Sequence, residues 1–246
     1  MAVTLDVVIP VLNEEDALQS SLTRLHAFMT TQMEDYEWTI VIADNGSTDT
    51  TPEVSRSLSR EFLRVQYHRI EDRGRGRALK SAWLESDSDV VVYMDVDLST
   101  DLKTLPALVS SIATEGYDVA IGSRLKKGAT VVGRTLLREA ISRTYNLIVF
   151  SLFFVSFRDA QCGFKALSRG AANSLLPVVQ DTAWFFDTEL LILAEKNGVR
   201  IKEIPVHWVD DPDSRVRILN TAFEDLKGLL RLRLGGLHTA RKKLQE

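Results

Sequence analysis

Short apolar runs and longer amphipathic segments alternate along the first half of the chain. The short runs are rich in β-branched residues and bounded by turn residues, and they predict strands at Leu5–Pro10, Trp38–Asp44, Val65–Arg69, Asp89–Met94 and Val119–Ser123. The segments between them predict helices at Ala17–Thr31, Thr51–Phe62, Arg77–Glu85 and Leu102–Glu115. This alternation is typical of a largely parallel sheet with helices on both faces, so we expect an α/β fold.

The second half contains an uncharged apolar run, Leu147–Phe157, between Arg143 and Arg158. The run is shorter than the roughly 20 residues that a helix needs to cross a bilayer. It is therefore either a core helix or an element that lies in the membrane interface. We expect no segment of this sequence to span a membrane.

The last stretch, residues 215–246, combines positive charge with apolar residues at near-helical spacing. It carries eight Lys/Arg against three acids. This pattern predicts a basic amphipathic helix that suits a membrane surface, although an ordinary helix docked on the protein core has the same pattern.

Composition adds an asymmetry of charge to this picture. With 246 residues, 45% of them apolar and 26% charged, the chain can bury one substantial core, so we expect one domain. Residues 1–123 hold 10 Lys/Arg against 21 Asp/Glu, and residues 124–246 hold 20 against 13. The acidic half can hold a divalent metal, and the basic half can meet phosphates or anionic lipid. A single cysteine, Cys162, and the absence of a secretion signal pattern predict a reducing, cytosolic compartment.

Candidate chemistry falls at the ends of the predicted strands, where ligands collect in parallel sheets. Asp95 and Asp97 follow an apolar strand, and two carboxylates at this spacing can turn onto one hard cation such as Mg²⁺ or Mn²⁺. Segment 44–49 either forms a turn with a helix cap or places Asp44 against a nucleobase. Segment 10–14 is equally ambiguous, because its acids also suit a helix N-terminus.

The second half offers further polar clusters. Segment 159–165 brings together an acid, an amide, a glycine and a lysine directly after the apolar run. Segment 184–189 places acids beside aromatics, which is familiar from sugar sites but is also expected of a capped helix start. Segment 213–217 either binds a phosphate through a hydroxyl and two cations or forms a solvated loop. The glycine-rich segment 73–77 lacks the spacing of a dinucleotide fingerprint, which argues against a nicotinamide enzyme.

Together and in order, these segments resemble glycosyltransferase family 2, and within it the polyprenyl-phosphate (dolichyl-phosphate) sugar synthases. The resemblance runs from Val7 to about Leu230 and is carried by Val8–Glu14, Ala43–Asp49, Gly74–Leu79, Asp95–Leu98, Gly122–Arg124 and Gln161–Lys165. It implies a Rossmann-like GT-A fold, with a nucleotide-sugar-binding half at 1–123, an acceptor-binding half at 124–214 and a basic amphipathic C-terminal helix at 215–246. Segments 161–165 and 184–189 look more like the glucose synthases than the mannose synthases, which favours UDP-glucose or another UDP-hexose as donor.

The resemblance also implies roles for single residues. Donor binding is expected from Pro10, Leu12, Glu14, Asp44, Asn45, Ser47, Arg75, Asp95, Val96, Asp97 and Ser123. Metal binding, to Mg²⁺ or Mn²⁺, is expected from Asp95 and Asp97. Acceptor binding is expected from Arg124, Gln161, Lys165, Trp184, Asp187, Glu189, Ser214, Arg215 and Arg217. The expected catalytic set is Asp97, Arg124, Asp159 and Lys165, with Asp159 orienting Lys165 or the acceptor. Arg75 stands where the family usually has lysine.

The expected reaction transfers a sugar from a nucleotide-sugar donor to polyprenyl phosphate, with inversion, at the cytoplasmic face of a membrane. A lipid phosphate is already anionic near neutral pH, so positioning and charge stabilisation matter more than a general base. Membrane contact is expected through amphipathic elements or a partner protein, and no nucleic-acid partner is expected. The alternatives are another donor, such as GDP-mannose or a UDP-N-acetylhexosamine, a non-lipid acceptor, or a non-catalytic nucleotide-sugar sensor.

Overall fold

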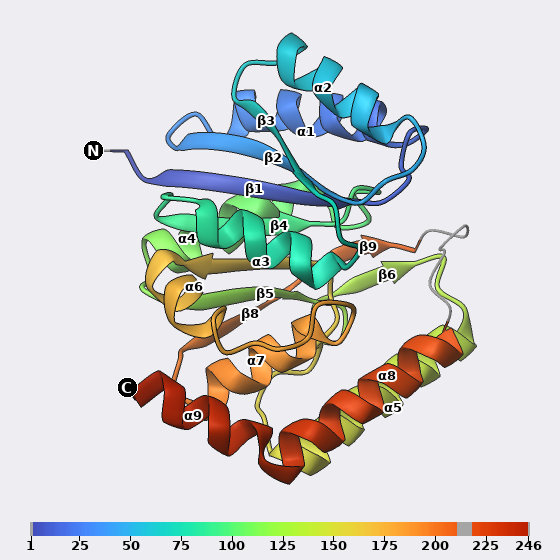
Figure 1. The fold of residues 1–246 in the computed structure, drawn as a ribbon, viewed down its shortest axis with the longest axis vertical. Coiled ribbons are helices and arrows are strands. Elements are labelled where there is room, and N and C mark those ends of the chain that lie inside the picture. Colours follow the sequence, from blue (N-terminus) through green and yellow to red (C-terminus); the bar gives the residue numbers. More distant parts are fainter. Residues whose placement is uncertain (1, 211–217, 246) are drawn as a thin grey trace.

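A computed structural model describes residues 2–210 and 218–245, which are built around a mostly parallel sheet (Figure 1). The strand order is β3-β2-β1-β4-β7-β5-β8. The strands are β1 Thr4–Val11, β2 Glu37–Asn45, β3 Val65–Ile70, β4 Val90–Met94, β5 Val119–Ser123, β7 Phe164–Ser168 and β8 Ile201–Pro205. Strand β7 runs antiparallel to β4 and β5, and the other neighbours are parallel. Strands β6 (Thr130–Val132) and β9 (His207–Val209) form a second, small sheet.

Helices cover the sheet on both faces, which leaves its central strands buried. One core forms against α1 (Leu18–Gln32), α2 (Thr51–Glu61) and α4 (Leu105–Ala113). The other forms against α3 (Arg75–Glu85), α5 (Leu136–Phe153), α6 (Arg169–Leu175), α7 (Phe186–Lys196), α8 (Ile218–Arg231) and α9 (Leu237–Gln245). The α/β fold expected from the alternating pattern is therefore confirmed.

The predicted strands and helices of the first half all form, with small shifts at their ends. Helix α3 begins at Arg75, two residues before the predicted start. The predicted helix 102–115 is divided into a 3₁₀ turn, Leu102–Thr104, which Asp101 caps through the Lys103 N–H, and α4. The sequence pattern missed β7 and β8, which are short and lie among helices in the second half.

Helix α5 and the C-terminal helices differ from the expected elements. The apolar run 147–157 forms only the end of the longer helix α5, which closes at Phe153, and the last two buried residues of the run, Val155 and Phe157, lie beyond the helix. In the described part of the stretch 215–246, the expected helix forms as two helices, α8 and α9. They are joined by the π-helical turn Leu232–Gly236, within which Gly235 adopts a φ of 143° that interrupts the regular helix.

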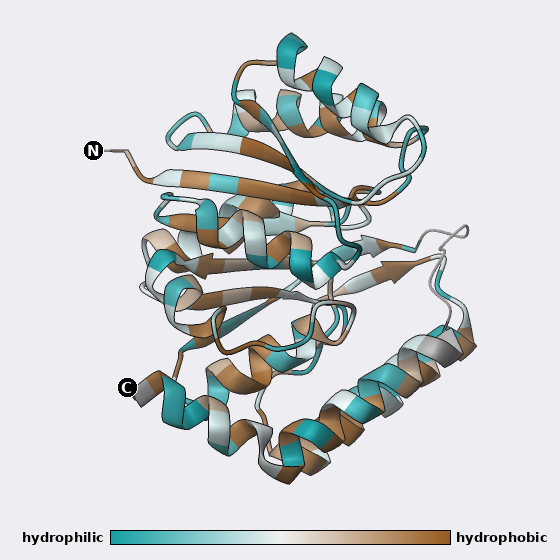
Figure 2. Ribbon diagram, viewed as in Figure 1, coloured by the Kyte–Doolittle hydropathy of each residue, from teal (hydrophilic) through white to brown (hydrophobic). Residues whose placement is uncertain are grey.

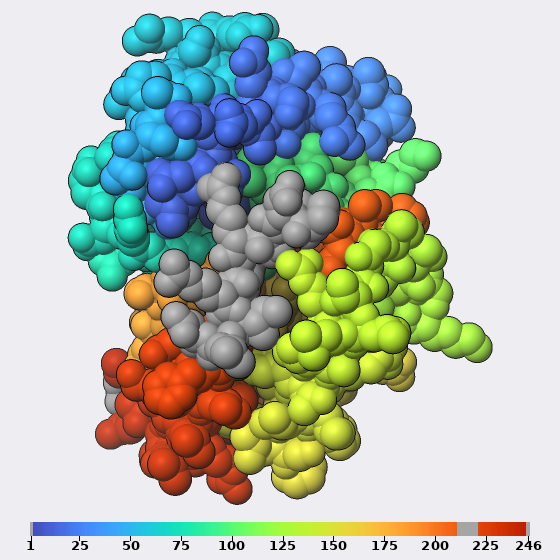
Figure 3. Space-filling model, turned by 90° about the vertical axis from the view of Figure 1, so that its right-hand side faces the viewer, coloured from blue at the N-terminus to red at the C-terminus, as the bar shows by residue number. Residues whose placement is uncertain are grey.

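Helices α5 and α8 lie alongside each other at one edge of the molecule (Figures 1 and 3). Both are amphipathic, with apolar and polar residues alternating around them (Figure 2). The apolar residues exposed on these helices and just after them are Leu136, Leu137, Ile141, Leu147, Phe150, Phe154, Phe223, Leu226, Leu230 and Leu234. Among the residues that the structure describes, no helix is long and apolar enough to cross a membrane.

Candidate active site

The two aspartates of the Asp-x-Asp motif lie in the turn that follows β4. The Asp95 N–H donates to the Gly163 carbonyl at 3.2 Å, and Asp97 Oδ1 accepts the Ser99 N–H at 2.9 Å. Leu98, between Asp97 and Ser99, has a φ of 51°, which turns the chain sharply behind the two carboxylates. Asp97 is exposed, and the side chain of Asp95 is 32% exposed. Both carboxylates can therefore be reached by a ligand.

The electrostatics of this turn suit a divalent cation. Burial raises the pKa of Asp95 and the charge of Asp97 raises it further, whereas Arg75 lowers it. Two like charges this close favour a cation between them. Within residues 2–210 and 218–245, no cluster of three or more His, Cys, Asp or Glu side chains could hold a metal. Two carboxylates alone leave most positions on a hard cation to water and diphosphate oxygens, so the donor set fits Mg²⁺ or Mn²⁺ in a nucleotide site.

A buried network of ion pairs and hydrogen bonds holds the side chain of Asp95 in place. Arg75 donates to Asp95 Oδ1 at 3.1 Å, to Asp187 Oδ2 at 2.6 Å and to the Tyr93 hydroxyl at 2.8 Å. Tyr93 in turn donates to Asp187 Oδ1 at 2.7 Å, and Lys165 Nζ lies 3.0 Å from the same oxygen. Burial opposes the charge on Asp187, but Lys165 and Arg75 hold its pKa below the usual value. The network therefore fixes the guanidinium that orients Asp95.

This network changes the roles expected for three residues. Lys165 is fully buried and donates to the Cys162 carbonyl at 2.5 Å, so it does not reach a ligand from this position. Asp187 is also buried, and its contacts are with protein cations. Trp184 is partly exposed and stacks on Arg75, with 5.0 Å between the guanidinium carbon and the ring centroid. Of the three, Trp184 is the residue that a ligand can touch.

Arg124 is held by Asp159 in a bidentate ion pair. Arg124 Nε and Nη2 donate to the two carboxylate oxygens, each at 2.8 Å, and the Arg124 N–H donates to Oδ2 at 2.9 Å. Burial acts to raise the pKa of Asp159, but Arg124 lowers it below the usual range. The expectation that Asp159 orients Lys165 is therefore corrected, because its contacts orient Arg124.

The Arg124 guanidinium and the aspartate turn share one region of the molecule. The guanidinium lies 4.8 Å from the ring centroid of Trp208 in β9. Trp208 forms a β-bridge with Thr100, and the Val209 N–H donates to the Ser99 carbonyl. Burial opposes the charge on Arg124, but Asp159, with a smaller contribution from Asp95, raises its pKa above the usual value. Arg124 is thus within electrostatic reach of Asp95.

Arg134 lies in the basic half of the chain and is a candidate residue that the sequence did not single out. Burial lowers the pKa of Arg134, and the nearby charge of Arg124 lowers it further. Its Nε has no hydrogen-bond partner among the described residues, although Nη1 donates to Glu139 at 3.2 Å. The two guanidinium groups are therefore near enough to interact electrostatically, and together they would favour an anion.

A second group of polar residues lies at the ends of β1 and β2. Asp44 is fully buried, and its oxygens accept the Ser47 N–H, the Tyr67 hydroxyl and Arg69 Nη1 at 2.8 to 2.9 Å. Arg69, with a 28% exposed side chain, and Tyr67 are the partly exposed members of this group. The carboxylate is therefore positioned by protein donors, and Arg69 and Tyr67 are candidate base contacts that the sequence did not suggest.

The other residues expected at the donor line the same strand ends or support them. Asn45 donates to the Val11 carbonyl at 2.7 Å and accepts the Gly74 N–H, so it ties the glycine loop to β1. Pro10, Ser47, Val96 and Ser123 are buried, whereas Leu12 and Glu14 are partly exposed. Ser123 accepts the Lys126 N–H at 3.1 Å. Its role is therefore to shape the loop after β5.

Two residues expected to bind the acceptor instead contact helix α8. Gln161 Nε2 donates to Asp225 Oδ2 at 2.7 Å. Glu189 is buried and pairs with Arg231 at 2.7 and 3.0 Å. Burial of Glu189 beneath α8 makes it a structural partner of Arg231. The expected residues Ser214, Arg215 and Arg217 lie outside the described residues.

The inward position of Asp225 predicts an unusual dependence of stability on pH. Burial, helped by the charges of Asp181 and Asp187 and opposed by the Gln161 hydrogen bond, raises the pKa of Asp225 to about 7. The unfolded carboxyl releases its proton near pH 4, so the folded state binds the extra proton between about pH 4 and 7 and its stability falls as pH rises. Asp225→Asn is therefore expected to have a higher free energy of unfolding in urea than the wild type at pH 8, by up to about 4 kcal/mol, and to match it at pH 4. An equal gain at both pH values would contradict this assignment.

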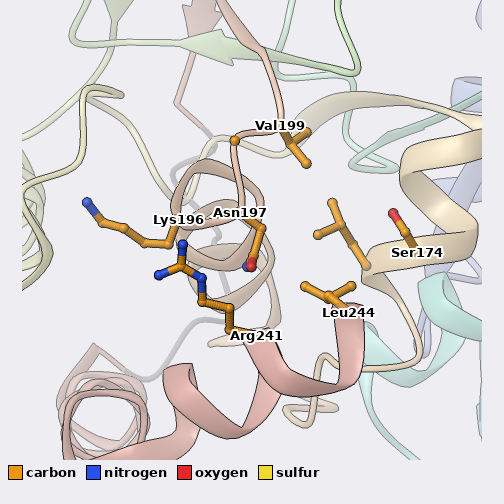
Figure 4. A pocket seen from close by; sticks show the side chains of 8 residues that line it. Ser174, Lys196, Asn197, Val199, Arg241 and Leu244 are labelled. Atoms are coloured by element: carbon orange, nitrogen blue, oxygen red, sulfur yellow. The ribbon is translucent and has the colours of Figure 1, made fainter. Parts of the chain in front are cut away.

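A separate hollow lies between α6, the end of α7 and α9 (Figure 4). Its lining combines Lys196 and Arg241 with Leu175, Val199 and Leu244. None of the residues assigned to the strand-end site lines this hollow.

Solved structures with this fold include a glycosyltransferase. The crystal structure of glucosyl-3-phosphoglycerate synthase from Mycobacterium tuberculosis matches with a TM-score of 0.69 at 20% identity, over 94% of this chain and 81% of that chain. A complex of the same enzyme with Mn²⁺, UDP and glucosyl-3-phosphoglycerate matches with a TM-score of 0.67 at 19% identity, over 97% and 80%. The protein therefore has the GT-A fold of nucleotide-sugar transferases.

Comparison of the sequence with known protein families identifies the family of this chain. Residues 6–176 match the profile of glycosyl transferase family 2, and the chain belongs to this family of glycosyltransferases. It is 30% identical to the dolichyl-phosphate beta-glucosyltransferase of Saccharomyces cerevisiae, over 97% of this chain and 78% of that protein. It is 36% identical to the glycosyltransferase AglD of Haloferax volcanii, over 88% of this chain but only 35% of AglD, so it spans about a third of that relative.

Proposed function

We propose that the protein transfers a hexose from a UDP-sugar, with UDP-glucose favoured, to polyprenyl phosphate, with inversion at the anomeric carbon and with Mg²⁺ or Mn²⁺ at Asp95 and Asp97. The observation that carries the proposal is the shared region formed by these two carboxylates and the clamped guanidinium of Arg124. The similarity to dolichyl-phosphate beta-glucosyltransferases supports the lipid acceptor and the glucosyl donor. The Mn²⁺ and UDP in the related crystal structure support the metal.

The residues of this chain position the donor and stabilise charge. A bound divalent metal would neutralise negative charge on the diphosphate leaving group. Asp95 and Asp97 would hold it, and Arg75 keeps Asp95 in place from the buried side. Arg69 and Tyr67 present polar groups to the base at the end of β2, and the buried carboxylate of Asp44 holds both in place. These groups are fixed before the substrate arrives, so little reorganisation opposes the reaction.

The acceptor phosphate is assigned to Arg124 and Arg134. Arg124 is held in place, because Asp159 binds the Nε–Nη2 edge of its guanidinium and Trp208 lies against its face. Arg134, whose charge interacts with that of Arg124, supplies a second cation nearby. An anionic phosphate held there needs no strong general base, and the rate depends on its alignment with the anomeric carbon.

Peripheral attachment to the cytoplasmic face of a membrane is the second part of the proposal. Helices α5 and α8 expose large apolar residues, including Phe150 and Phe223, which are 52% and 66% exposed. Basic residues on the same helices, such as Arg143 and Lys227, suit an anionic lipid surface. A membrane-anchoring partner protein bound to these helices is the alternative source of attachment.

Vesicle binding tests this surface. The double variant Phe150→Asp/Phe223→Asp is expected to bind vesicles of phosphatidylcholine and phosphatidylserine at least about tenfold more weakly than the wild type in flotation assays, and wild-type binding is expected to fall with salt. The matched control is Leu63→Asp, since Leu63 is 85% exposed in the loop between α2 and β3. Equal losses in both variants would argue against a specific lipid face.

The activity itself is tested with a panel of radiolabelled nucleotide sugars. Label from UDP-glucose should become extractable into organic solvent only when polyprenyl phosphate and Mg²⁺ or Mn²⁺ are present. GDP-mannose and a UDP-N-acetylhexosamine serve as alternative donors, and 3-phosphoglycerate serves as a soluble phosphate acceptor. Transfer to 3-phosphoglycerate with none to the lipid would overturn the acceptor assignment.

A further inference from the structure

Helix α8 carries one buried carboxylate, that of Asp225, on the side that faces the protein. Asp225 is 3% exposed, whereas Glu224 and Lys227 on the same helix lie in solvent. Asp225 Oδ2 accepts Gln161 Nε2 at 2.7 Å, and Oδ1 has no hydrogen-bond partner in the described part of the chain. An apolar side chain would fill an inward position without the cost of desolvating a carboxylate. The carboxylate therefore indicates a role other than packing.

The partner of Asp225 begins the turn that contacts the metal-binding carboxylate. Two residues after Gln161, the Gly163 carbonyl accepts the Asp95 N–H. The Gly163 backbone lies so close to Asp95 that a Cβ at this position would be 1.7 Å from Asp95 Oδ2. Any displacement of turn 161–163 therefore moves the Asp95 carboxylate or its backbone.

The rest of α8 is seated on the segment that carries Asp187. Gly228 packs against Phe185 so closely that a Cβ would lie 2.3 Å from the ring. Arg231 forms its bidentate pair with Glu189 in α7. Asp187, between Phe185 and Glu189, binds Arg75, which in turn binds Asp95. Helix α8 thus contacts both of the segments that hold Asp95.

We infer that Asp225 is a positioning residue for sugar transfer: through the Gln161 amide it holds turn 161–163 against Asp95 and so sets the geometry of the metal-binding carboxylate. The inference rests on the proposed function, because it assumes that Asp95 binds the metal. It also makes α8, whose opposite side exposes Phe223, Leu226 and Leu230, the element that connects the proposed lipid face to the metal site.

The test measures Mn²⁺ binding in the presence of UDP, with free Mn²⁺ followed by electron paramagnetic resonance. Asp225→Ala is expected to bind Mn²⁺ about tenfold more weakly and to lower kcat for lipid glucosylation about tenfold, with KM for polyprenyl phosphate within about twofold. Asp225→Asn is expected to recover most of the Mn²⁺ affinity, because its amide oxygen still accepts the Gln161 hydrogen bond. Glu224→Ala, on the exposed side of the same helix, is the matched control.

Gln161→Ala should reproduce the loss, and the double variant with Asp225→Ala should be no worse than either single variant, because both remove one interaction. If Asp225→Ala does not fold, the Mn²⁺ affinity of Gln161→Ala is by itself the test of the inference.

Unchanged Mn²⁺ affinity in Gln161→Ala, or equal losses in Asp225→Asn and Asp225→Ala, would overturn the inference. Normal Mn²⁺ binding by a wild type that does not glucosylate polyprenyl phosphate would remove only the acceptor part of the proposed function. A wild type that binds no Mn²⁺ with UDP would remove the inference and the metal assignment together.

Discussion

Asp97→Asn is expected to lower the rate of sugar transfer about a thousandfold, which corresponds to about 4 kcal/mol of transition-state stabilisation. The amide keeps the size of the side chain and can still accept the Ser99 N–H, so the turn should fold normally. What is lost is one of the two charges that would hold the metal, at the residue that is more exposed to a ligand. Initial rates at saturating UDP-glucose and Mn²⁺, together with Mn²⁺ titrations, measure the effect.

Asp101→Asn provides the control for this variant. Asp101 lies four residues further along the same loop and caps the following 3₁₀ turn through the Lys103 N–H, a role that asparagine also performs. It should retain the wild-type rate. If Asp97→Asn also transferred sugar at the wild-type rate in Mn²⁺, the metal assignment would be wrong.

Asp159→Ala is expected to destabilise the protein by about 3 to 5 kcal/mol, because it leaves the buried guanidinium of Arg124 without its counter-ion. The lowered pKa of Asp159 adds a dependence on pH. The stabilisation is present above the unfolded pKa of about 3.9 and is lost as pH falls through the lower folded value. Urea unfolding at pH 7 should therefore show a larger difference between variant and wild type than unfolding near pH 3.

Glu53→Ala is the matched comparison, since it breaks an exposed ion pair with Arg56. Exposed pairs contribute at most about 1 kcal/mol, so its midpoint should change little. Asp159→Ala should also lose most of its activity at temperatures where it remains folded, because the released Arg124 no longer holds a fixed position. A destabilisation no larger than that of Glu53→Ala would show that the pair is not a buried clamp.

The elements of the first half could be predicted because their chemistry is local. An apolar β-branched run such as Val90–Met94 has few alternatives to a buried strand, and the acids that follow it must then lie at the strand end. The same reasoning could not find β7, because its five residues include no β-branched residue and its partners, β4 and β5, are distant in sequence. Strand pairing over such distances leaves no local pattern.

The sequence predicted which polar residues lie near the aspartate turn better than it predicted what each of them contacts there. Lys165, Asp187 and Arg124 all lie near the aspartate turn, as expected, but the sequence does not tell which cation faces a ligand and which neutralises a buried acid. That choice depends on the side of the strand or helix on which each residue lies in the folded protein. Tyr93 illustrates the one available signal, a lone hydroxyl within an apolar strand that needs a buried partner.

The antiparallel insertion of β7 also sets an order of assembly for the chain during synthesis. Strands β1 to β4 can pair as they emerge from the ribosome, but one edge of β4 stays open until residues 164–168 arrive, about 70 residues later by the numbering of the two strands. Only then does Gly163 close the turn at Asp95. A nascent chain stalled after β5 would hold the nucleotide half without a finished metal site, so catalytic competence is delayed until the acceptor half has been made.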